Sequence, residues 1–486
     1  MSTTTLSDHG GAFTELPHGY RLVVGLEVHV ELHTATKLFC GCPNQFGDEP
    51  NTNVCPVCLG LPGSMPVLNA RAMELAMRLG RALQCEVRPS VFARKNYFYP
   101  DMPKDYQISQ YDQPTNVDGH LDLPDGTRIG IERAHIEEDT GKSTHVGGGG
   151  RIHDAAYSLV DYNRCGVPLV EIVSRPDFRT AEQAKAYVNE LRAILTATGV
   201  SDAKMEEGSL RVDANVSVHQ PDTPFGTRCE IKNINSVRSL GRAIEYEALR
   251  QVDLLEAGER VIQQTRHWNE DEGRTHMLRS KEEAEDYRYF PEPDLVPMVP
   301  EQARIDEIDA ALPRLPAERR SALADAAGRT LPDESVTIVV DRDLDELALD
   351  AVASGADADR TLTHLQHDLD PAQVGNVSAE NLAQLVQLET SGKLTASQAK
   401  QVVAEMGETG KAPDAIAAER GFEAMDTSEL ESIVDDAIAA NGDAWAKYCA
   451  GEQKAQGAIV GHVMKATRGQ ADGKVVTQIL EQRRSA

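Results

Sequence analysis

The segment Gly25-Leu-Glu-Val-His-Val-Glu-Leu32 alternates apolar and polar side chains over its whole length. Side chains of a β-strand point to opposite faces with a period of two, so this pattern predicts a strand with one apolar and one polar face. The same alternation recurs over residues 210–218, and residues 169–173 predict a third strand that carries Glu171. These segments predict a β-sheet whose apolar face is covered by other parts of the chain.

Four cysteines follow the first strand in two short pairs, Cys40-Gly-Cys42 and Cys55-Pro-Val-Cys58. This spacing is typical of a structural zinc site, in which four thiolates surround Zn²⁺ as a tetrahedron. The alternatives are disulfides or four unrelated thiols. Disulfides are disfavoured because no signal peptide is visible and the other cysteines are scattered singly. We therefore expect a zinc clip at Cys40, Cys42, Cys55 and Cys58.

The chain of 486 residues is long enough for several domains. We expect a flexible tail over residues 1–18, a mainly antiparallel β domain with the zinc clip over 19–295, an acidic helical domain over 296–410 and a small helical domain over 411–486. The tail is rich in Ser, Thr and Gly, which favours a loose N-terminus. The predicted fold class is α+β, followed by all-α domains.

Several segments show the apolar spacing of helices. Residues 70–83 and 181–198 predict helices beside the sheet. Two groups near the C-terminus repeat at helical spacing, and each predicts one apolar helix face: Ile459, Val460, Val463 and Met464, then Val475, Val476, Ile479 and Leu480. The glycine run at 147–150 predicts a turn or an insert.

The formal net charge is −28, which taken alone argues against contact with nucleic acid, because phosphates attract Lys and Arg. The charge is unevenly distributed, however. Residues 301–440 carry 29 acidic and 11 basic side chains, whereas residues 449–486 carry 3 acidic and 6 basic ones. The mildly basic C-terminal segment therefore stays compatible with an RNA partner.

The acidic surplus also predicts a high-salt cytoplasm, where screening makes repulsion between like charges tolerable. No apolar run approaches the roughly 18 to 20 residues of a membrane span. We therefore expect a soluble, cytoplasmic and halophilic protein that does not enter a membrane.

Polar side chains recur on the predicted strands in a pattern that suits a metal site. Glu27, His29 and Glu31 share one face of the first strand, and Asp213 shares a face with Asn215 on another. If these strands pair, the carboxylates converge and repel one another unless a cation such as Mg²⁺, which also binds nucleotide phosphates, neutralises them. The alternative is a solvated polar face of a half-covered sheet.

The segment Arg94-Lys-Asn-Tyr-Phe-Tyr-Pro-Asp101 mixes basic and aromatic side chains. Such a segment can stack a base while Lys95 binds a phosphate, or it can be a strand with packed aromatics. Thr140-Gly-Lys-Ser143 is not a P-loop, because Glu137 stands where the upstream glycine belongs. No nucleophile elbow is present either, so any covalent amide chemistry has to come from another protein.

An ordered set of motifs resembles the B subunits of the glutamine-dependent aspartyl/glutamyl-tRNA amidotransferases. The similarity extends from about residue 20 to the end of the chain. The motifs that carry it are Gly25–Glu31, Arg94–Pro100, Tyr106–Gln110, Glu137–Asp139, Lys204–Arg211 and Asp286–Pro293. The related archaeal E subunits have an extra inserted domain for which this chain has no room. Together with the acidic composition, the resemblance leads us to expect a source among halophilic archaea.

The resemblance implies an ATP-dependent ligase with a cradle-like catalytic domain. Such enzymes phosphorylate the side-chain carboxylate of Asp or Glu misattached to tRNA(Asn) or tRNA(Gln), and ammonia then displaces the phosphate. Ammonia comes from glutamine through the partner glutaminase, which is the A subunit of a heterotrimer that also contains the C subunit. The zinc site would be structural.

The resemblance also implies roles for particular residues. The Mg²⁺ ligands would be His29, Glu138 and Glu171, which together with Lys95 would bind the nucleotide. The catalytic residues would be Glu27, Lys95, Glu138 and Asp213. The C-terminal domain would bind tRNA outside its acceptor end, with Lys465, Arg468 and Lys474 as candidates. Two alternatives are a non-catalytic zinc-containing tRNA-binding protein and a stand-alone ATP-dependent amide ligase.

Overall fold

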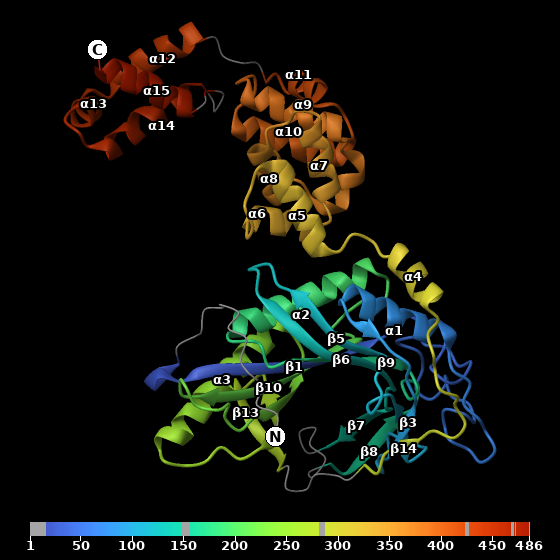
Figure 1. The fold of residues 1–486 in the computed structure, drawn as a ribbon. Coiled ribbons are helices and arrows are strands. Elements are labelled where there is room, and N and C mark those ends of the chain that lie inside the picture. Colours follow the sequence, from blue (N-terminus) through green and yellow to red (C-terminus); the bar gives the residue numbers. More distant parts are fainter. Residues whose placement is uncertain are drawn as a thin grey trace. The chain divides into compact units, whose positions relative to one another are not determined.

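The structure, a computed structural model, describes residues 16–147, 155–280, 287–422, 427–467, 471 and 473–485. It divides into two compact units, residues 1–317 and 318–486, which are described separately (Figure 1). Most of the expected tail, and the expected glycine turn from residue 148 onward, lie outside the described residues.

The first unit is built around a large sheet that has 12 strands within the described part of the chain. The path of hydrogen-bonded neighbours runs β13-β12-β11-β10-β1-β9-β6-β4-β3-β14, with β5 beside β6 and β2 beside β5. Only β11 and β12 pair in parallel among these strands, so the predicted antiparallel character is confirmed. The strands are β1 (Arg21–Glu31), β2 (Glu86–Val87), β3 (Ala93–Asn96), β4 (Tyr106–Ser109), β5 (Asn116–Asp122), β6 (Arg128–Glu138), β9 (Pro168–Ser174), β10 (Leu210–His219), β11 (Cys229–Ile234), β12 (Gln264–Asn269), β13 (Arg274–Ser280) and β14 (Phe290–Pro291). A separate pair, β7 (Lys142–Val146) and β8 (Tyr157–Asp161), forms a small second sheet.

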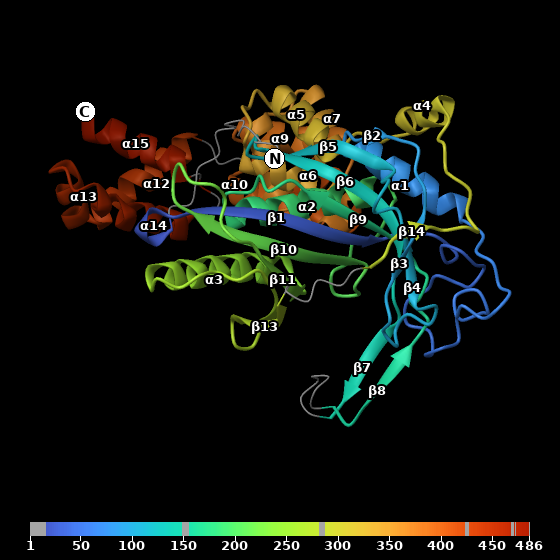
Figure 2. The ribbon, with the colours of Figure 1, turned by 60° about the horizontal axis from the view of Figure 1, so that its bottom comes forward.

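Helices cover the apolar face of the large sheet. They are α1 (Ala70–Ala82), α2 (Ala181–Ala197) and α3 (Val237–Glu256), and α4 (Gln302–Ala310) packs on α1. In Figure 2, α2 and α3 run roughly along β1 and β10. Each of the first three helices starts at a residue whose side chain accepts backbone N–H groups of the first turn: Asn69, Thr180 and Ser236. The helices predicted at 70–83 and 181–198 are therefore confirmed.

Strand β1 shows how the sheet separates its two faces. Leu26 and Val28 are buried in the same hydrophobic cluster as Leu191 of α2 and Ile244 of α3. Because side chains alternate along a strand, the acidic and imidazole side chains of β1 point away from these helices. The apolar burial therefore holds the polar face of β1 in a fixed position.

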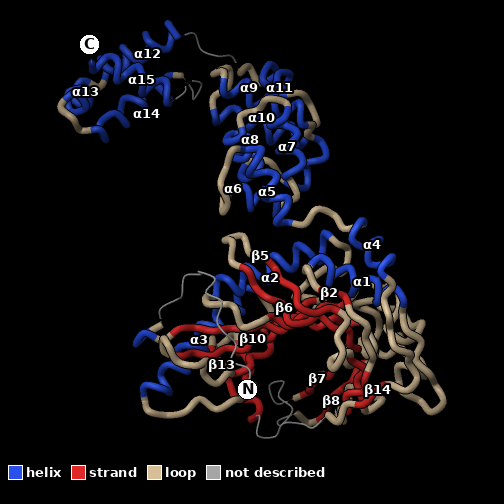
Figure 3. Tube along the Cα trace, in the orientation of Figure 1, coloured by secondary structure: helices blue, strands red, loops and turns tan. Residues whose placement is uncertain are grey.

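The second unit is helical (Figure 3). Its helices are α5 (Pro316–Ala327), α6 (Glu334–Asp341), α7 (Asp345–Ala353), α8 (Ala358–His367), α9 (Ala379–Thr390), α10 (Ala396–Thr409), α11 (Pro413–Glu419), α12 (Thr427–Ala440), α13 (Gly442–Cys449), α14 (Gln456–Ala466) and α15 (Gly473–Ser485). One hydrophobic cluster spans residues 323–417 and another spans residues 430–480. The latter contains Ile459, Val463, Val476 and Ile479, which confirms the two predicted apolar helix faces. None of the helices in the described ranges is long and apolar enough to cross a lipid bilayer.

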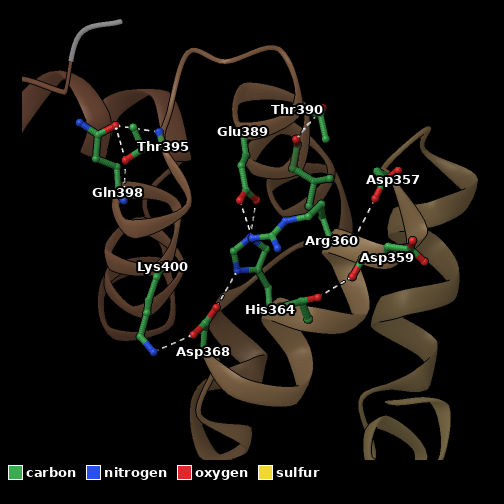
Figure 4. A network of polar contacts seen from close by, with 12 residues as sticks. Asp357, Asp359, Arg360, His364, Asp368, Glu389, Thr390, Thr395, Gln398 and Lys400 are labelled. Carbon is green, nitrogen blue, oxygen red and sulfur yellow. Dashed lines mark hydrogen bonds and ion pairs between the residues drawn. The ribbon is translucent and has the colours of Figure 1, made fainter. Parts of the chain in front are cut away.

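A buried polar network joins three of these helices (Figure 4). His364 of α8 has no exposed surface, and its ring nitrogens lie 3.0 Å from Asp368 and 2.8 Å from Glu389 of α9. Arg360 also donates to Glu389, and Lys400 of α10 pairs with Asp368 at 3.0 Å. The opposite charges offset the cost of burying these carboxylates.

Candidate active site

A cavity of about 460 Å³ lies on the polar side of the sheet. It is lined by residues from β1, β3, β6, β10 and β11, which are far apart in sequence and come together through strand pairing. Charged or ionisable side chains on its wall are His29, Lys95, Glu137, Asp139, Arg211, Asp213 and Lys232. The expected convergence of polar side chains is therefore present, and the face is hollowed rather than flat.

One group of possible metal ligands consists of His29, Glu137 and Glu171, with one ligand atom from each lying within 4.8 Å of the others. The register places Glu171 of β9 directly opposite His29 of β1, and Glu137 of β6 approaches from the next strand. The distance from His29 Nε2 to Glu137 Oε1 is 3.8 Å. One nitrogen and two carboxylates in this arrangement suit a divalent cation.

The ionisation of this group fits a cation site. Burial lowers the pKa of His29 to about 4, so its imidazole is neutral at pH 7 and has a free lone pair. Burial, and then the charge of Glu171, raise the pKa of Glu137 to about 8. Two carboxylates at close range resist joint ionisation unless a positive charge compensates them.

The predicted ligand set of His29, Glu138 and Glu171 differs from the group that the structure brings together. Glu138 is buried on the other face of β6, where both of its oxygens accept hydrogen bonds from Lys104, at 2.6 and 2.5 Å. Adjacent residues of a strand point to opposite faces, so Glu137 and Glu138 cannot both reach His29. The structure brings Glu137 to the site in place of Glu138.

A second carboxylate group lies next to the first and consists of Glu27, Asp213 and Glu230. Asn215 donates to Glu27 at 2.9 Å, and Lys232 pairs with Asp213 at 2.6 Å and with Glu230 at 2.9 Å. Burial and then the charge of Glu171 raise the pKa of Glu27, and burial raises that of Asp213. The ammonium of Lys232 therefore occupies part of the space that a second cation would need.

Lys95 stands on β3 at the wall of the cavity. Its ammonium lies 4.7 Å from the ring centroid of Tyr287, and among the described residues no carboxylate approaches it within 4.0 Å. Nearby, Phe98 is 75% exposed and Tyr97 stacks on Tyr99. Within the described residues, an ammonium that contacts an aromatic ring and has no carboxylate within 4.0 Å is compatible with the predicted binding of a phosphate.

Sequence reasoning missed several residues of the site. Glu137, Asp139, Arg211 and Lys232 line the cavity, and Glu230 belongs to the second carboxylate group. Arg211 donates to Asp139 at 2.6 Å. Burial opposes the ionisation of Asp139, but the nearby positive charge of Arg211 prevails and lowers the pKa of Asp139. The signal that could have identified Glu137 is alternation with His135, two residues earlier on the same strand. Glu230 and Lys232 needed the pairing of β11 with β10, which the local sequence does not reveal.

The four cysteines of the predicted zinc clip come together, with sulfur atoms mutually within 4.8 Å. The sulfur atoms of Cys55 and Cys58 are 3.9 Å apart, close to the roughly 3.8 Å edge of a tetrahedron with Zn–S bonds of about 2.3 Å. The backbone N–H of Cys55 donates to the sulfur of Cys58 at 3.1 Å, as expected for a thiolate ligand. All four are free cysteines, and their arrangement fits Zn²⁺.

The three predicted tRNA-binding residues lie toward the C-terminus. Lys465 is exposed in the last turn of α14. Arg468 lies outside the described residues, and Lys474 belongs to α15, where its side chain is not described.

Clustered buried carboxylates, an imidazole and a lysine around one cavity are typical of an enzyme active site. The chain belongs to the GatB family, which confirms the resemblance inferred from its motifs. A family model described as "GatB/GatE catalytic domain" matches residues 22–306, and one described as "GatB domain" matches residues 358–483.

Curated relatives match the chain over nearly its whole length. A protein from Salinispora tropica is 49% identical over 99% of both chains, and one from Thermobifida fusca is 47% identical over 99% of both. A protein from Carboxydothermus hydrogenoformans is 47% identical over 95% of this chain and 98% of its own. All three are named as the B subunit of aspartyl/glutamyl-tRNA(Asn/Gln) amidotransferase. These relatives are bacterial, so they give no support to the expected origin in a halophilic archaeon.

Proposed function

We propose that this chain is the B subunit of a glutamine-dependent tRNA amidotransferase, a ligase that forms carbon–nitrogen bonds. It would use ATP to convert the side-chain carboxylate of Asp-tRNA(Asn), Glu-tRNA(Gln) or both to an amide. The observation that carries the proposal is one cavity lined by Lys95, His29 and Glu137, the last two of which form a group of possible metal ligands with Glu171. The names of the full-length relatives support the same function.

The chemistry explains why such a cavity is needed. A carboxylate is a poor electrophile because its oxygens are poor leaving groups, and conversion to an acyl phosphate removes that obstacle. Transfer of the phosphoryl group depends on positioning and on neutralisation of its negative charge rather than on a protein nucleophile. The absence of a nucleophile motif in the sequence agrees with this division of labour.

Each group of side chains has a part in that step. His29, Glu137 and Glu171 would hold Mg²⁺, which when bound would neutralise charge on the phosphate oxygens. Lys95 would donate to the transferred phosphate or to the reacting carboxylate. Glu27 and Asp213, held by Asn215 and Lys232, would shape the wall beside them.

Other parts of the chain would serve assembly and substrate binding. The Cys₄ group would hold a structural Zn²⁺. Ammonia would come from a partner glutaminase, the A subunit, in a heterotrimer with the C subunit. Residues 411–486, including Lys465, would bind the misacylated tRNA away from its acceptor end, and the basic balance of residues 449–486 suits phosphate contacts.

The direct test uses the chain co-expressed with the A and C subunits. Misacylated Asp-tRNA(Asn) or Glu-tRNA(Gln), glutamine and ATP labelled on the γ-phosphate are supplied, and phosphate release is followed together with amidated tRNA. The proposal predicts coupled formation of both products with at least one of the two tRNAs. Binding of tRNA without either product would overturn it and leave a non-catalytic tRNA-binding protein.

A further inference from the structure

His135 stands beside the proposed cation ligands, yet it belongs to neither carboxylate group. It lies on β6 directly opposite Glu171 of β9, and His29 of β1 lies opposite Glu171 on the other side. The distance from His135 Nε2 to Glu171 Oε2 is 3.4 Å. Glu171 is therefore flanked by two imidazoles in one cross-strand row.

The environment of His135 leaves its polar atoms without other partners. His135 is buried, and neither ring nitrogen makes a hydrogen bond within the part of the chain that the structure describes. The ring of Tyr111 contacts the imidazole edge-to-face at 6.1 Å between centroids, and the guanidinium of Arg133 lies over Tyr111. A buried polar group without a hydrogen bond destabilises the fold, so a histidine with a purely structural role would be unfavourable here.

The geometry separates two possible roles for this imidazole. His29, Glu137 and Glu171 each offer an atom to one group within 4.8 Å, and His135 is not part of that group. Its Nε2 lies closer to Glu171, at 3.4 Å, than to Glu137, at 4.0 Å. This arrangement favours contact of His135 with Oε2 of Glu171 over direct contact with a cation.

We propose that His135 is a positioning residue whose Nε2–H donates to Glu171 when a cation is bound and thereby turns the other oxygen of that carboxylate toward the cation. The inference rests on the proposed function, because it needs a cation at His29, Glu137 and Glu171. Hydrogen bonds from outside the ligand group orient ligands in this way, and their loss typically weakens metal affinity by about 10- to 100-fold. Tyr111 would keep the imidazole in place and shield the bond from water.

The test measures binding of Mn²⁺, a spectroscopic probe for the Mg²⁺ site, to the full-length chain. Electron paramagnetic resonance is recorded in about 0.5 M KCl, which screens weak binding to the acidic surface. His135→Phe keeps an aromatic ring but removes the donor. His135→Gln places an amide N–H near the position of Nε2. We expect His135→Phe to weaken Mn²⁺ binding by at least about 10-fold and His135→Gln to stay within about 3-fold of wild type.

Other outcomes would overturn the inference in distinguishable ways. Unchanged affinity in His135→Phe would show that the imidazole does not act on the cation site. Equal losses in both variants would assign the effect to packing rather than to the donated hydrogen bond. Failure of the wild-type chain to bind Mn²⁺ would overturn the cation site of the proposed function itself. Zinc content and near-ultraviolet circular dichroism check folding, and His135→Leu replaces the Phe variant should that one not fold.

Discussion

Glu137 and Glu138 are adjacent in sequence, but their carboxylates lie on opposite faces of β6. Glu137 faces His29 and Glu171, whereas Glu138 forms a buried ion pair with Lys104. One face of β6 therefore contributes a carboxylate to the group of possible cation ligands, and the other face contributes a carboxylate to a buried ion pair. Any assignment of the cation ligands depends on this separation, since only one of the two carboxylates can be part of the ligand group.

Lys95 is expected to be essential for phosphoryl transfer. Lys95→Met keeps the length of the side chain and removes its charge, so phosphate release in the heterotrimer should fall by about 100-fold or more, as for other single donors to a developing charge. Glutaminase activity should persist, because it belongs to the A subunit. Lys142→Met is the matched control, since Lys142 is exposed on β7 and does not line the cavity. Comparable phosphate release by the Lys95 and Lys142 variants would refute this role.

The cysteine group is expected to hold one Zn²⁺ per chain. Cys55→Ser should lose the metal and lower the melting temperature, because the loops from Cys40 to Cys58 depend on the ion for their closure. Cys449→Ser, at an exposed cysteine of α13, should keep both zinc and stability. Metal analysis of chelator-free preparations, together with thermal unfolding, measures the effect. Full zinc content in the Cys55 variant would contradict the assignment.

Glu389 gives a prediction of pH dependence in the second unit (Figure 4). Burial opposes its ionisation, but hydrogen bonds from His364 and Arg360 prevail and lower its pKa below the ordinary value. A carboxyl with a lowered pKa stabilises the fold above its unfolded pKa, near 4.5, and this contribution is lost as the pH falls through the folded pKa. Glu389→Gln should therefore destabilise α8 and α9 by about 1–3 kcal/mol at pH 7 and by much less once the pH lies below the lowered pKa of Glu389 in the folded protein.

Hydrogen exchange of the α8 and α9 amides measures this local stability at the two pH values. Glu408→Gln, at an exposed position of α10, is the control and should change little at either pH. A loss for Glu389→Gln that is equally large at both pH values would show that its charge is not the cause.

The sequence predicted those features that depend on local pattern. Alternation in β1, the helical spacing of α1 and α2 and the cysteine spacing all led to the observed elements, because each is set by residues close together in the chain. The motif resemblance could not separate Glu137 from Glu138, because the motif covers both residues and only the direction of each side chain on the strand shows which one faces His29. Lys104, the partner of Glu138, is 34 residues away in sequence, and no local signal links them.

The basic C-terminal segment is expected to contribute to tRNA binding. Ile416 and Ala417 belong to the hydrophobic cluster of residues 323–417, so a deletion at residue 411 would damage that core. Removal of residues 423–486 spares it and should weaken tRNA affinity while ATP turnover at saturating tRNA falls much less. Filter binding at several salt concentrations should also show a smaller salt dependence for the truncated complex. Unchanged affinity would place the tRNA contacts elsewhere.

The comparison of Glu137→Gln with Glu138→Gln tests the central claim most directly. Both variants remove one carboxylate charge from neighbouring positions of β6, and Mn²⁺ affinity of the full-length chain is the measurement. We predict that Glu137→Gln weakens Mn²⁺ binding by more than about 100-fold. That factor is the upper end of the range for residues that only hydrogen-bond to a metal ligand. Glu138→Gln should bind Mn²⁺ within about 3-fold of wild type, although it is less stable because Lys104 loses its buried partner.

Lys104→Met combined with Glu138→Gln removes both charges of that pair and keeps the comparison possible in a folded protein. Loss of Mn²⁺ binding in the Glu138 variants, with normal binding by Glu137→Gln, would contradict the account.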